Sequence, residues 1–181
     1  MDIPLRYRSR RAFVPAAGNR EFRAGVWYNV TPHTMELFQI DDDGQLFIAP
    51  ALDRWDTPAR HGIDVVIDLE GGLDACIPTV SNHCVYVYFP IDDDDQQLPN
   101  LAKLRAIARL AASLISDGHR VLAHCGMGYN RSALMAGLIL TELGMPGSQA
   151  VSRLRQRRPG ALYNETFAAL VESHRTDIIG V

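Results

Sequence analysis

Short apolar runs alternate along the chain with longer segments in which apolar residues recur at helical spacing. The short runs have the length of buried strands, and "IDVVIDL" at residues 63–69 has the β-branched composition typical of them. The runs that predict strands are 35–40, 45–50, 63–69, 84–90 and 120–124. The first two flank "DDDG", a sequence typical of a hairpin turn.

The longer segments predict helices. Leucine and alanine recur at helical spacing between Pro99 and Gly118, and residues 132–144 are so apolar that we expect a central helix there. The segments that predict helices are 54–62, 98–119, 132–144, 146–160 and 164–174. Strands that alternate with helices in this way predict an α/β fold with a central, mostly parallel sheet flanked by helices.

The composition fits one domain with a short extension. The chain has 181 residues, and 47% of them are hydrophobic, which suffices for a substantial core. The net charge of −3 argues against general binding to nucleic acid or to a membrane surface, and no stretch approaches the apolar length of a membrane span. The N-terminus is basic but lacks the apolar run of a signal peptide.

The three cysteines are Cys76, Cys84 and Cys125. An odd and sparse count argues against a disulfide framework and favours a reducing compartment, so we expect a cytoplasmic protein. The chain has neither a CxxC pair nor an HExxH spacing, so we expect no metal site.

Residues 1–35 predict a basic arm of uncertain, loosely organised structure, and we place the catalytic domain at residues 36–181. The arm carries arginines without a clear period: Arg6, Arg8, Arg10, Arg11, Arg20 and Arg23. A solvated tail and a docking arm for an acidic partner are the two interpretations of such a segment.

The chain contains two His-Cys pairs in different settings. Cys84 of the first pair is followed by "VYVYFP", which has no glycine, so we interpret it as a small core residue beside a strand. Cys125 of the second pair opens the loop "CGMGYN" between a predicted strand and the apolar helix, and this loop contains Gly126 and Gly128. A strand, loop and helix in this order form a recurrent anion site, because loop N–H groups and the positive helix end converge on one point.

The side chains of this loop suggest phosphate chemistry. Arg131 stands at the helix start, where its guanidinium can hold two oxygens of a phosphate. The helix end and this arginine favour the thiolate form of Cys125 over the thiol. A thiolate beneath a phosphate-sized cradle is a nucleophile aimed at phosphorus. We therefore expect the loop to bind phosphate, sulfate or vanadate.

The sequence His124-Cys125, five further residues and Arg131-Ser132 resembles the active-site motif of the cysteine-dependent protein tyrosine phosphatase superfamily, dual-specificity branch. The likeness extends from about "QLFIAP" to "FAALV". It implies a phosphatase-type fold and a cofactor-independent phosphoric monoester hydrolase with a phosphocysteine intermediate. Cys125 would be the nucleophile, and Ser132 would hydrogen-bond the sulfur. The residues implied to bind phosphate are Gly126, Met127, Gly128, Tyr129, Asn130 and Arg131.

The resemblance also implies a general acid on the loop "FPIDDDDQQLP". The family pattern "P-I-x-D" points to Asp93, with Asp92 as the next choice and Asp94 and Asp95 less favoured. Adjacent carboxylates repel one another, which raises the affinity of at least one of them for a proton. A solvated acidic turn is the alternative, and it is our interpretation of the other acidic run at 41–43.

Five further residues carry expectations of their own. We expect His124 to shape the loop through hydrogen bonds, and Met127 and Tyr129 to form the pocket rim. Arg158 falls where some relatives place a second anion-binding arginine, although a helix-end or solvent role is the alternative. Asn164 predicts the N-cap of the last helix.

The sequence is compatible with more than one class of substrate. Asn130 replaces the small residue that many relatives carry before the arginine, and "N-R" is similar to the RNA 5′-triphosphatase branch, whose members often lack the acid. We expect a protein tyrosine or dual-specificity phosphatase acting on a phosphorylated protein or a small phosphate ester. An RNA 5′-phosphatase is an alternative, and nucleic acid is the less favoured substrate. The loop has no lysine, which weakens the case for phosphoinositides.

Two other function classes remain. A phosphate-reading module would bind phosphoproteins with little turnover, and a rhodanese-like sulfur carrier fits His124 and Ser132 poorly. A redox role is also open, because Cys76 or Cys84 could trap an oxidised Cys125 as a disulfide.

Overall fold

The structure is a computed structural model that describes residues 20–23, 26–29 and 35–174, with side chains over the last range. The chain divides at Thr34 into two compact units. In the first unit, β1 (Arg20–Arg23) and β2 (Val26–Asn29) pair antiparallel, with Arg20 opposite Asn29. The sequence analysis, which expected a loosely organised arm of uncertain structure, did not predict these two strands. The first four arginines of the arm lie outside the described residues.

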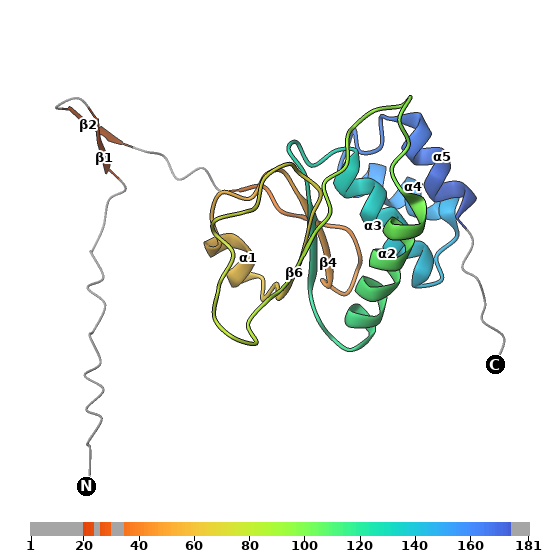
Figure 1. The fold of residues 1–181 in the computed structure, drawn as a ribbon, viewed down its shortest axis with the longest axis horizontal. Coiled ribbons are helices and arrows are strands. Elements are labelled where there is room, and N and C mark those ends of the chain that lie inside the picture. The colour runs from red at the N-terminus through yellow and green to blue at the C-terminus, as the bar shows by residue number, and fades with distance from the viewer. Residues whose placement is uncertain (1–19, 24–25, 30–34, 175–181) are drawn as a thin grey trace, which may run out of the picture. The chain divides into compact units, whose positions relative to one another are not determined.

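The second unit is built on a five-stranded sheet with the order β3-β4-β7-β5-β6. Only β3 runs antiparallel to its neighbour, and the other pairs are parallel. The strands are β3 (Phe38–Gln39), β4 (Leu46–Ala49), β5 (Val65–Asp68), β6 (Val85–Tyr88) and β7 (Val121–His124). The predicted α/β fold with a mostly parallel sheet is confirmed (Figure 1). Every predicted strand is present.

In the part of the chain that the structure describes, five helices connect or follow the strands, and all five were predicted. They are α1 (Asp56–Arg60), α2 (Leu101–Ser116), α3 (Arg131–Glu142), α4 (Gly147–Arg157) and α5 (Glu165–Ser173). The boundaries differ by a few residues from those predicted. For example, α2 begins at Leu101 because the side chain of Asn100 accepts a hydrogen bond from the Lys103 N–H and caps the helix. Among the described residues, none of the helices combines the length and apolarity needed to cross a membrane.

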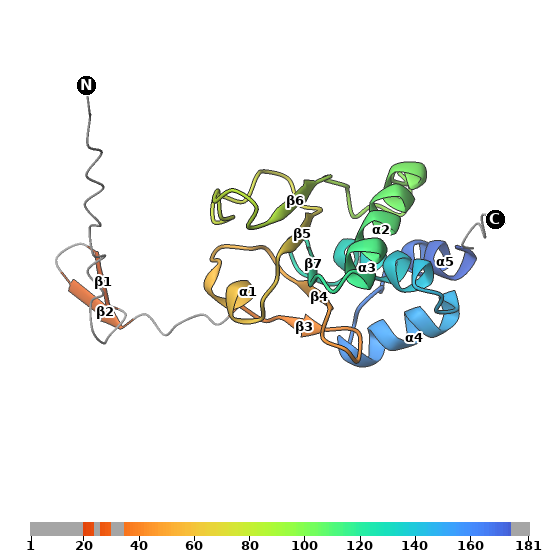
Figure 2. The ribbon, with the colours of Figure 1, turned by 90° about the horizontal axis from the view of Figure 1, so that it is seen from below.

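The alternation of side chains along each strand produces two cores. Leu46 and Ile48 of β4 point into the larger core, which also contains α2 to α5, whereas Phe47 and Ala49 point into a smaller core on the other face. Figure 2 shows α2 to α5 together on one side of the sheet and α1 on the other. Helix α3 is the centre of the larger core, since all of residues 132–141 are buried. This agrees with its predicted central place.

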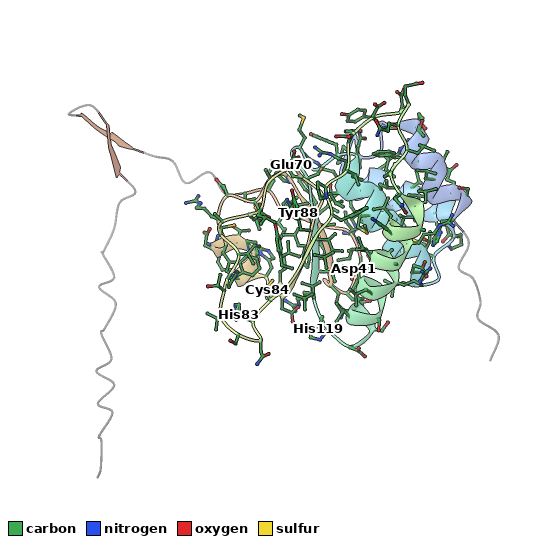
Figure 3. All side chains as sticks on the ribbon, viewed as in Figure 1. Asp41, Glu70, His83, Cys84, Tyr88 and His119 are labelled. Carbon is green, nitrogen blue, oxygen red and sulfur yellow. The ribbon has the colours of Figure 1, made fainter. Side chains whose placement is uncertain are left out.

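The parallel strands bring several loops to one edge of the sheet. Ala49, Asp68 and His124 are register partners at the ends of β4, β5 and β7. The loops that follow these strands therefore begin side by side, as is usual for ligand sites in open α/β sheets. The other pair, His83-Cys84, precedes β6 and lies at the opposite edge, as Figure 3 shows for His83 and Cys84 relative to Glu70.

Candidate active site

Cys125 follows β7 directly and is 2% exposed. Its sulfur accepts a hydrogen bond from the Gly128 N–H at 3.3 Å and lies 3.5 Å from the Ser132 hydroxyl. Helix α3 begins at Arg131, so the sulfur lies within the turn that leads into a helix N-terminus. Both the N–H donor and the positive helix end place partial positive charge beside the sulfur.

Gly128 is required by the path of this loop. Its φ of +70° lies in the left-handed region, and a Cβ atom there would come within 2.7 Å of backbone atoms of Ala49 and Pro50. These neighbours are main-chain atoms at the end of β4, so they cannot rotate away as a flexible side chain could. The loop therefore approaches the sheet more closely than any residue with a side chain would permit.

Arg131 has its guanidinium held on one side by three acceptors. Nη1 donates to the carbonyl oxygens of Leu69 and Ile91, at 3.3 and 3.2 Å, and Nη2 donates to Glu70 Oε2 at 2.7 Å. The Nε–H is buried and has no hydrogen-bond partner among the described residues. Leaving the N–H of a buried cation without an acceptor is unfavourable in free energy. This group is therefore suited to donate a hydrogen bond to an anionic ligand.

Glu70 is a site residue that the sequence analysis missed. Its carboxylate accepts hydrogen bonds from Arg131 and from the N–H groups of Gly71 and Gly126. Partial burial raises the pKa of Glu70, but these hydrogen bonds and the arginine charge outweigh burial and hold the pKa below its usual value. Glu70 thus stays ionised and links the loop after β5 to the loop after β7. An acidic residue just after a buried strand of a parallel sheet was the only local sign of it.

The acidic loop brings Asp93 to the phosphate loop. Its carboxylate accepts hydrogen bonds from the side-chain amides of Asn130 and Asn164. Asp94 and Asp95 instead contact Gln96 of their own loop. Asp92, the second choice for the acid, is exposed, as is Asp93, so the two asparagine contacts and not burial distinguish Asp93.

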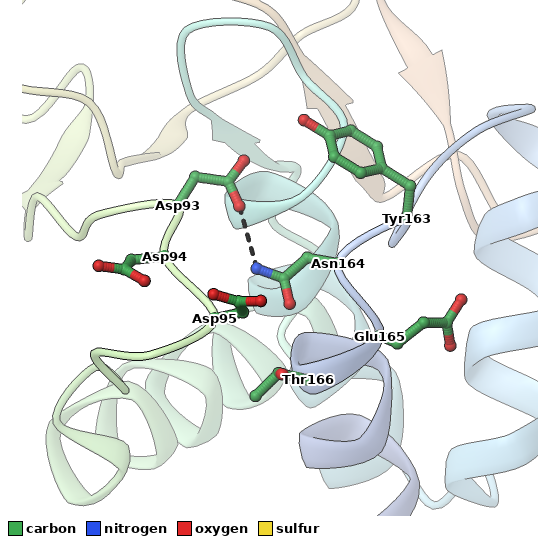
Figure 4. Close-up of a pocket in the computed structure, with 7 residues that line it drawn as sticks. All are labelled: Asp93, Asp94, Asp95, Tyr163, Asn164, Glu165 and Thr166. Carbon is green, nitrogen blue, oxygen red and sulfur yellow. Dashed lines mark hydrogen bonds between the residues drawn. The ribbon is translucent and has the colours of Figure 1, made fainter.

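A pocket of about 630 Å³ lies beside Asp93 and separates the acidic loop from the start of α5 (Figure 4). Several of its lining groups are carboxylates. The lining residues are Asp93, Asp94, Asp95, Tyr163, Asn164, Glu165 and Thr166. Asn164 also accepts a hydrogen bond from the Phe167 N–H, which confirms the predicted N-cap of α5.

His124 belongs to a buried polar cluster behind Cys125. Its Nε2 lies 2.7 Å from Asp74 Oδ2 and 3.6 Å from Asp68 Oδ1, and Tyr86 donates a hydrogen bond to Asp68. Burial, aided by the charge of Asp68 and opposed by that of His124, raises the pKa of Asp74. Burial together with the hydrogen bond to Asp68 raises the pKa of Tyr86.

The ligand atoms of Asp68, Asp74 and His124 lie within 4.8 Å of one another, so the cluster is a candidate metal site by distance. However, Asp68 already accepts hydrogen bonds from the Glu70 N–H and from Tyr86. We therefore interpret the cluster as a buried polar network in which the carboxylates of Asp74 and Asp68 lie close to the His124 ring, whose two nitrogens make no hydrogen bond within the described residues. The absence of a metal site stays a prediction.

Tyr129 and Arg158 pack against each other. The guanidinium of Arg158 lies 3.9 Å from the ring centre of Phe38 and 4.0 Å from that of Tyr129, and it approaches Glu36 at 3.4 Å. The Tyr129 carbonyl accepts the Leu162 N–H, so the rim of the loop is tied to the segment after α4. The sandwich supports the loop through cation–π contacts. A second role for Arg158 in anion binding stays a prediction. Met127, at the other rim position, is 68% exposed.

The other two cysteines lie in unreactive settings. Both are partly buried and free, and both pack against the smaller core. Burial raises the pKa of the Cys84 thiol to about 11 with help from the charge of Asp64, and burial also raises that of Cys76. Few thiolates would therefore be available near neutral pH to attack an oxidised Cys125. The disulfide stays a prediction.

The acidic run of the hairpin has structural partners. Asp41 accepts hydrogen bonds from the Gln45 and Leu46 N–H groups. Asp42 contacts Arg153 and Arg157 of α4, and the Arg153 hydrogen bond lowers the pKa of Asp42. These contacts join the hairpin to α4.

Comparison with known proteins identifies the family. The model of the dual specificity phosphatase catalytic domain matches residues 47–176. Human DUSP28 is similar in structure, with a TM-score of 0.64, 20% identity and coverage of 79% of this chain and 95% of that one. The phosphatase domain of Yvh1 from Chaetomium thermophilum has a TM-score of 0.62, 23% identity and coverage of 76% and 94%.

A third similar structure is a mouse dual specificity phosphatase complexed with zinc tungstate, with a TM-score of 0.64, 19% identity and coverage of 79% and 88%. At these identities the structural likenesses show a common fold. A comparison with curated protein sequences found no match.

Proposed function

The chain belongs to the dual-specificity phosphatase family and is a cysteine-dependent phosphatase; from this premise we propose that Cys125 is its nucleophile, Arg131 its phosphate-binding side chain and Asp93 its general acid. We further propose that residues 36–181 form the catalytic domain. The remaining steps follow from the geometry of these three side chains.

In the first step, the Cys125 thiolate attacks phosphorus on the side opposite the leaving oxygen. An S–P bond forms and the P–O bond to the leaving group breaks, while Asp93 gives its proton to the leaving oxygen. The N–H groups of residues 126–131 and the Arg131 guanidinium hold the three equatorial oxygens, over which the negative charge spreads.

In the second step, water attacks the phosphorus of the phosphocysteine. Asp93, now ionised, takes a proton from this water, and the S–P bond breaks to release phosphate and the thiolate. Ser132, 3.5 Å from the sulfur, can donate a hydrogen bond that stabilises the departing thiolate. Arginine and backbone N–H groups supply the positive field in both steps, so the proposed mechanism uses no cofactor.

One observation carries the assignment. The buried Nε–H of Arg131 has no hydrogen-bond partner among the described residues, while its other nitrogens are held by Leu69, Glu70 and Ile91. The guanidinium is thus fixed in place with one strong donor left for a ligand. An oxyanion next to Cys125 would satisfy this donor.

The substrates of the family are phosphorylated compounds, and we propose a phosphorylated protein as the substrate of this member. The carboxylates of Asp94, Asp95 and Glu165 line the pocket beside the acid. Their charge disfavours polyanionic substrates such as RNA 5′-phosphates or phosphoinositides. A small phosphate ester is the second candidate. We also propose that phosphate, sulfate and vanadate bind the loop and that the protein acts in the cytoplasm.

Hydrolysis of p-nitrophenyl phosphate in the presence of a chelator tests the mechanism. Cys125→Ser and Arg131→Ala should each abolish turnover, whereas Cys84→Ser should retain it. If Cys125→Ser keeps the activity of the natural protein, the assignment of Cys125 as the nucleophile is wrong. Comparing Asp92→Asn with Asp93→Asn tests the acid. The variant that lacks the true general acid should hydrolyse esters with poor leaving groups much more slowly, while its rate on good leaving groups should change less. Tight phosphopeptide binding with negligible turnover would instead indicate a phosphate-reading module.

A further inference from the structure

Three segments that are distant in sequence meet at the carboxylate of Asp93. Asn130, the last residue of the phosphate loop, is 1% exposed, and its Nδ2 donates to Asp93 Oδ1 at 3.1 Å and to Oδ2 at 2.9 Å. Asn164, just before α5, donates from its Nδ2 to Asp93 Oδ1 at 3.2 Å, the contact drawn in Figure 4. The carboxylate is therefore bound by groups from outside its own loop.

The orientation of both amides is fixed by their carbonyl oxygens. Asn130 Oδ1 accepts the Asn164 backbone N–H at 3.1 Å, and Asn164 Oδ1 accepts the Phe167 N–H at 3.2 Å. Turning either amide over would place its NH2 group against a backbone N–H and its oxygen against a carboxylate. The NH2 groups must therefore face Asp93.

We propose that Asn130 and Asn164 are positioning residues that hold the Asp93 carboxyl group ready for proton transfer, an inference that rests on the function proposed above. Each carboxylate oxygen has two lone pairs. Oδ1 accepts from both asparagines, whereas Oδ2 accepts only from Asn130 among the described residues. Oδ2 is thus the oxygen that carries the proton and passes it to the leaving oxygen as the P–O bond breaks.

The arrangement gives a physical reason for an asparagine before Arg131. A serine or glycine there would be too short to reach Asp93 while also accepting the Asn164 N–H. The phosphate loop and the acid are consequently linked directly. Binding of the phosphoryl group and placement of the acid then depend on the same short segment, so the acid is placed before substrate arrives rather than by it.

The test measures how rate depends on the leaving group. For Asn130→Ser, the ratio of kcat/KM for p-nitrophenyl phosphate, whose leaving group hardly needs an acid, to that for phenyl phosphate should rise about tenfold. This is a fraction of the 10²–10⁴-fold that general acids contribute. In the Asp93→Asn background, adding Asn130→Ser should leave the ratio at the value of the single Asp93 variant.

Asn164 also caps α5, and a second pair of variants separates the two roles. Asn164→Ser keeps an oxygen that can cap the helix but loses the amide donor, so the ratio should again rise. Asn100→Ser makes the same change at the cap of α2 and should leave the ratio as in the natural protein.

The positioning role is overturned if Asn130→Ser slows both esters equally, if it slows neither, or if its effect on the ratio persists without Asp93. These outcomes differ from a failure of the proposed function. That failure would appear as turnover in Cys125→Ser, or as an Asp93→Asn variant whose rate loss does not depend on the leaving group.

Discussion

Arg131 and Glu70 are 61 positions apart in the chain, yet Nη2 of the arginine lies 2.7 Å from Oε2 of the glutamate. The same carboxylate accepts the Gly126 N–H, so it binds both ends of the phosphate loop. Glu70 therefore orients the guanidinium and the loop together, while leaving the Nε–H of Arg131 without a protein partner among the described residues. The geometry of the anion site depends on a residue outside the loop.

Removal of Glu70 should weaken phosphate binding and catalysis together. We expect Glu70→Ala to lower kcat/KM by roughly 10- to 100-fold for good and poor leaving groups alike, because misplacement of the arginine affects every substrate. Glu70→Gln, which keeps an acceptor but not the charge, should lose less. Vanadate inhibition constants measured alongside should rise in the same order. Glu172→Gln, a charge change on the exposed side of α5, serves as the control. A loss confined to poor leaving groups would contradict this role.

Gly128 should not tolerate a side chain. Gly128→Ala combines a positive φ with a Cβ atom 2.7 Å from the backbone of Ala49 and Pro50, and we expect it to destabilise the fold by more than about 2 kcal/mol and to abolish activity. Gly118→Ala provides the matched control, since its φ is +92° but a Cβ atom would meet nothing within 4 Å. That variant should lose only about 1–2 kcal/mol and remain active. Urea unfolding and aryl phosphate hydrolysis measure both effects, and equal losses in the two variants would show that the close approach to β4 is unimportant.

Within residues 35–174, the local pattern of the sequence was sufficient to predict the strands, the helices and the phosphate loop. Periodicity identifies β5 and α2, and the spacing from Cys125 to Arg131 lies within one continuous segment. Glu70 was missed because its role arises from a contact across 61 positions that no local pattern encodes. Asn130 was expected in the phosphate loop and noted as an unusual residue there, but its contact with Asp93 was not predicted, since Asp93 lies 37 positions away.

The hairpin of β1 and β2 was missed for a different reason. Arginines interrupt the apolar positions of residues 20–29, so the segment lacks the alternation on which strand prediction relies. Likewise, four consecutive aspartates cannot be told apart by local sequence. Their distinction lies in the asparagines that reach only one of them, Asp93.

The two His-Cys pairs should differ in thiol reactivity. The pKa of Cys84 is raised to about 11, so its alkylation by iodoacetamide should be slow near pH 7 and rise about tenfold per pH unit toward that value. Cys125 should react faster near neutral pH, and phosphate or vanadate should protect it. Peptide mapping by mass spectrometry after timed labelling distinguishes the two sites. Rapid labelling of Cys84 at neutral pH, or labelling of Cys125 that added oxyanions do not affect, would contradict the assignments.

The ion pair between His119 and Asp64 should make stability depend on pH. His119 Nδ1 lies 2.7 Å from Asp64 Oδ2, and this hydrogen bond, aided by the charge of Asp64, raises the pKa of His119 above its ordinary value. A raised pKa in the folded state means that protonation favours folding, so the contribution is fully present below the unfolded pKa of about 6.5 and is lost as the pH rises through the folded pKa. The melting temperature of the natural protein should therefore exceed that of His119→Gln at about pH 5.5, and the difference should shrink toward zero by about pH 9. His83→Gln, a change at an exposed histidine of another loop, provides the control. A difference that stays constant or grows with pH would show that the imidazolium is not what stabilises this contact.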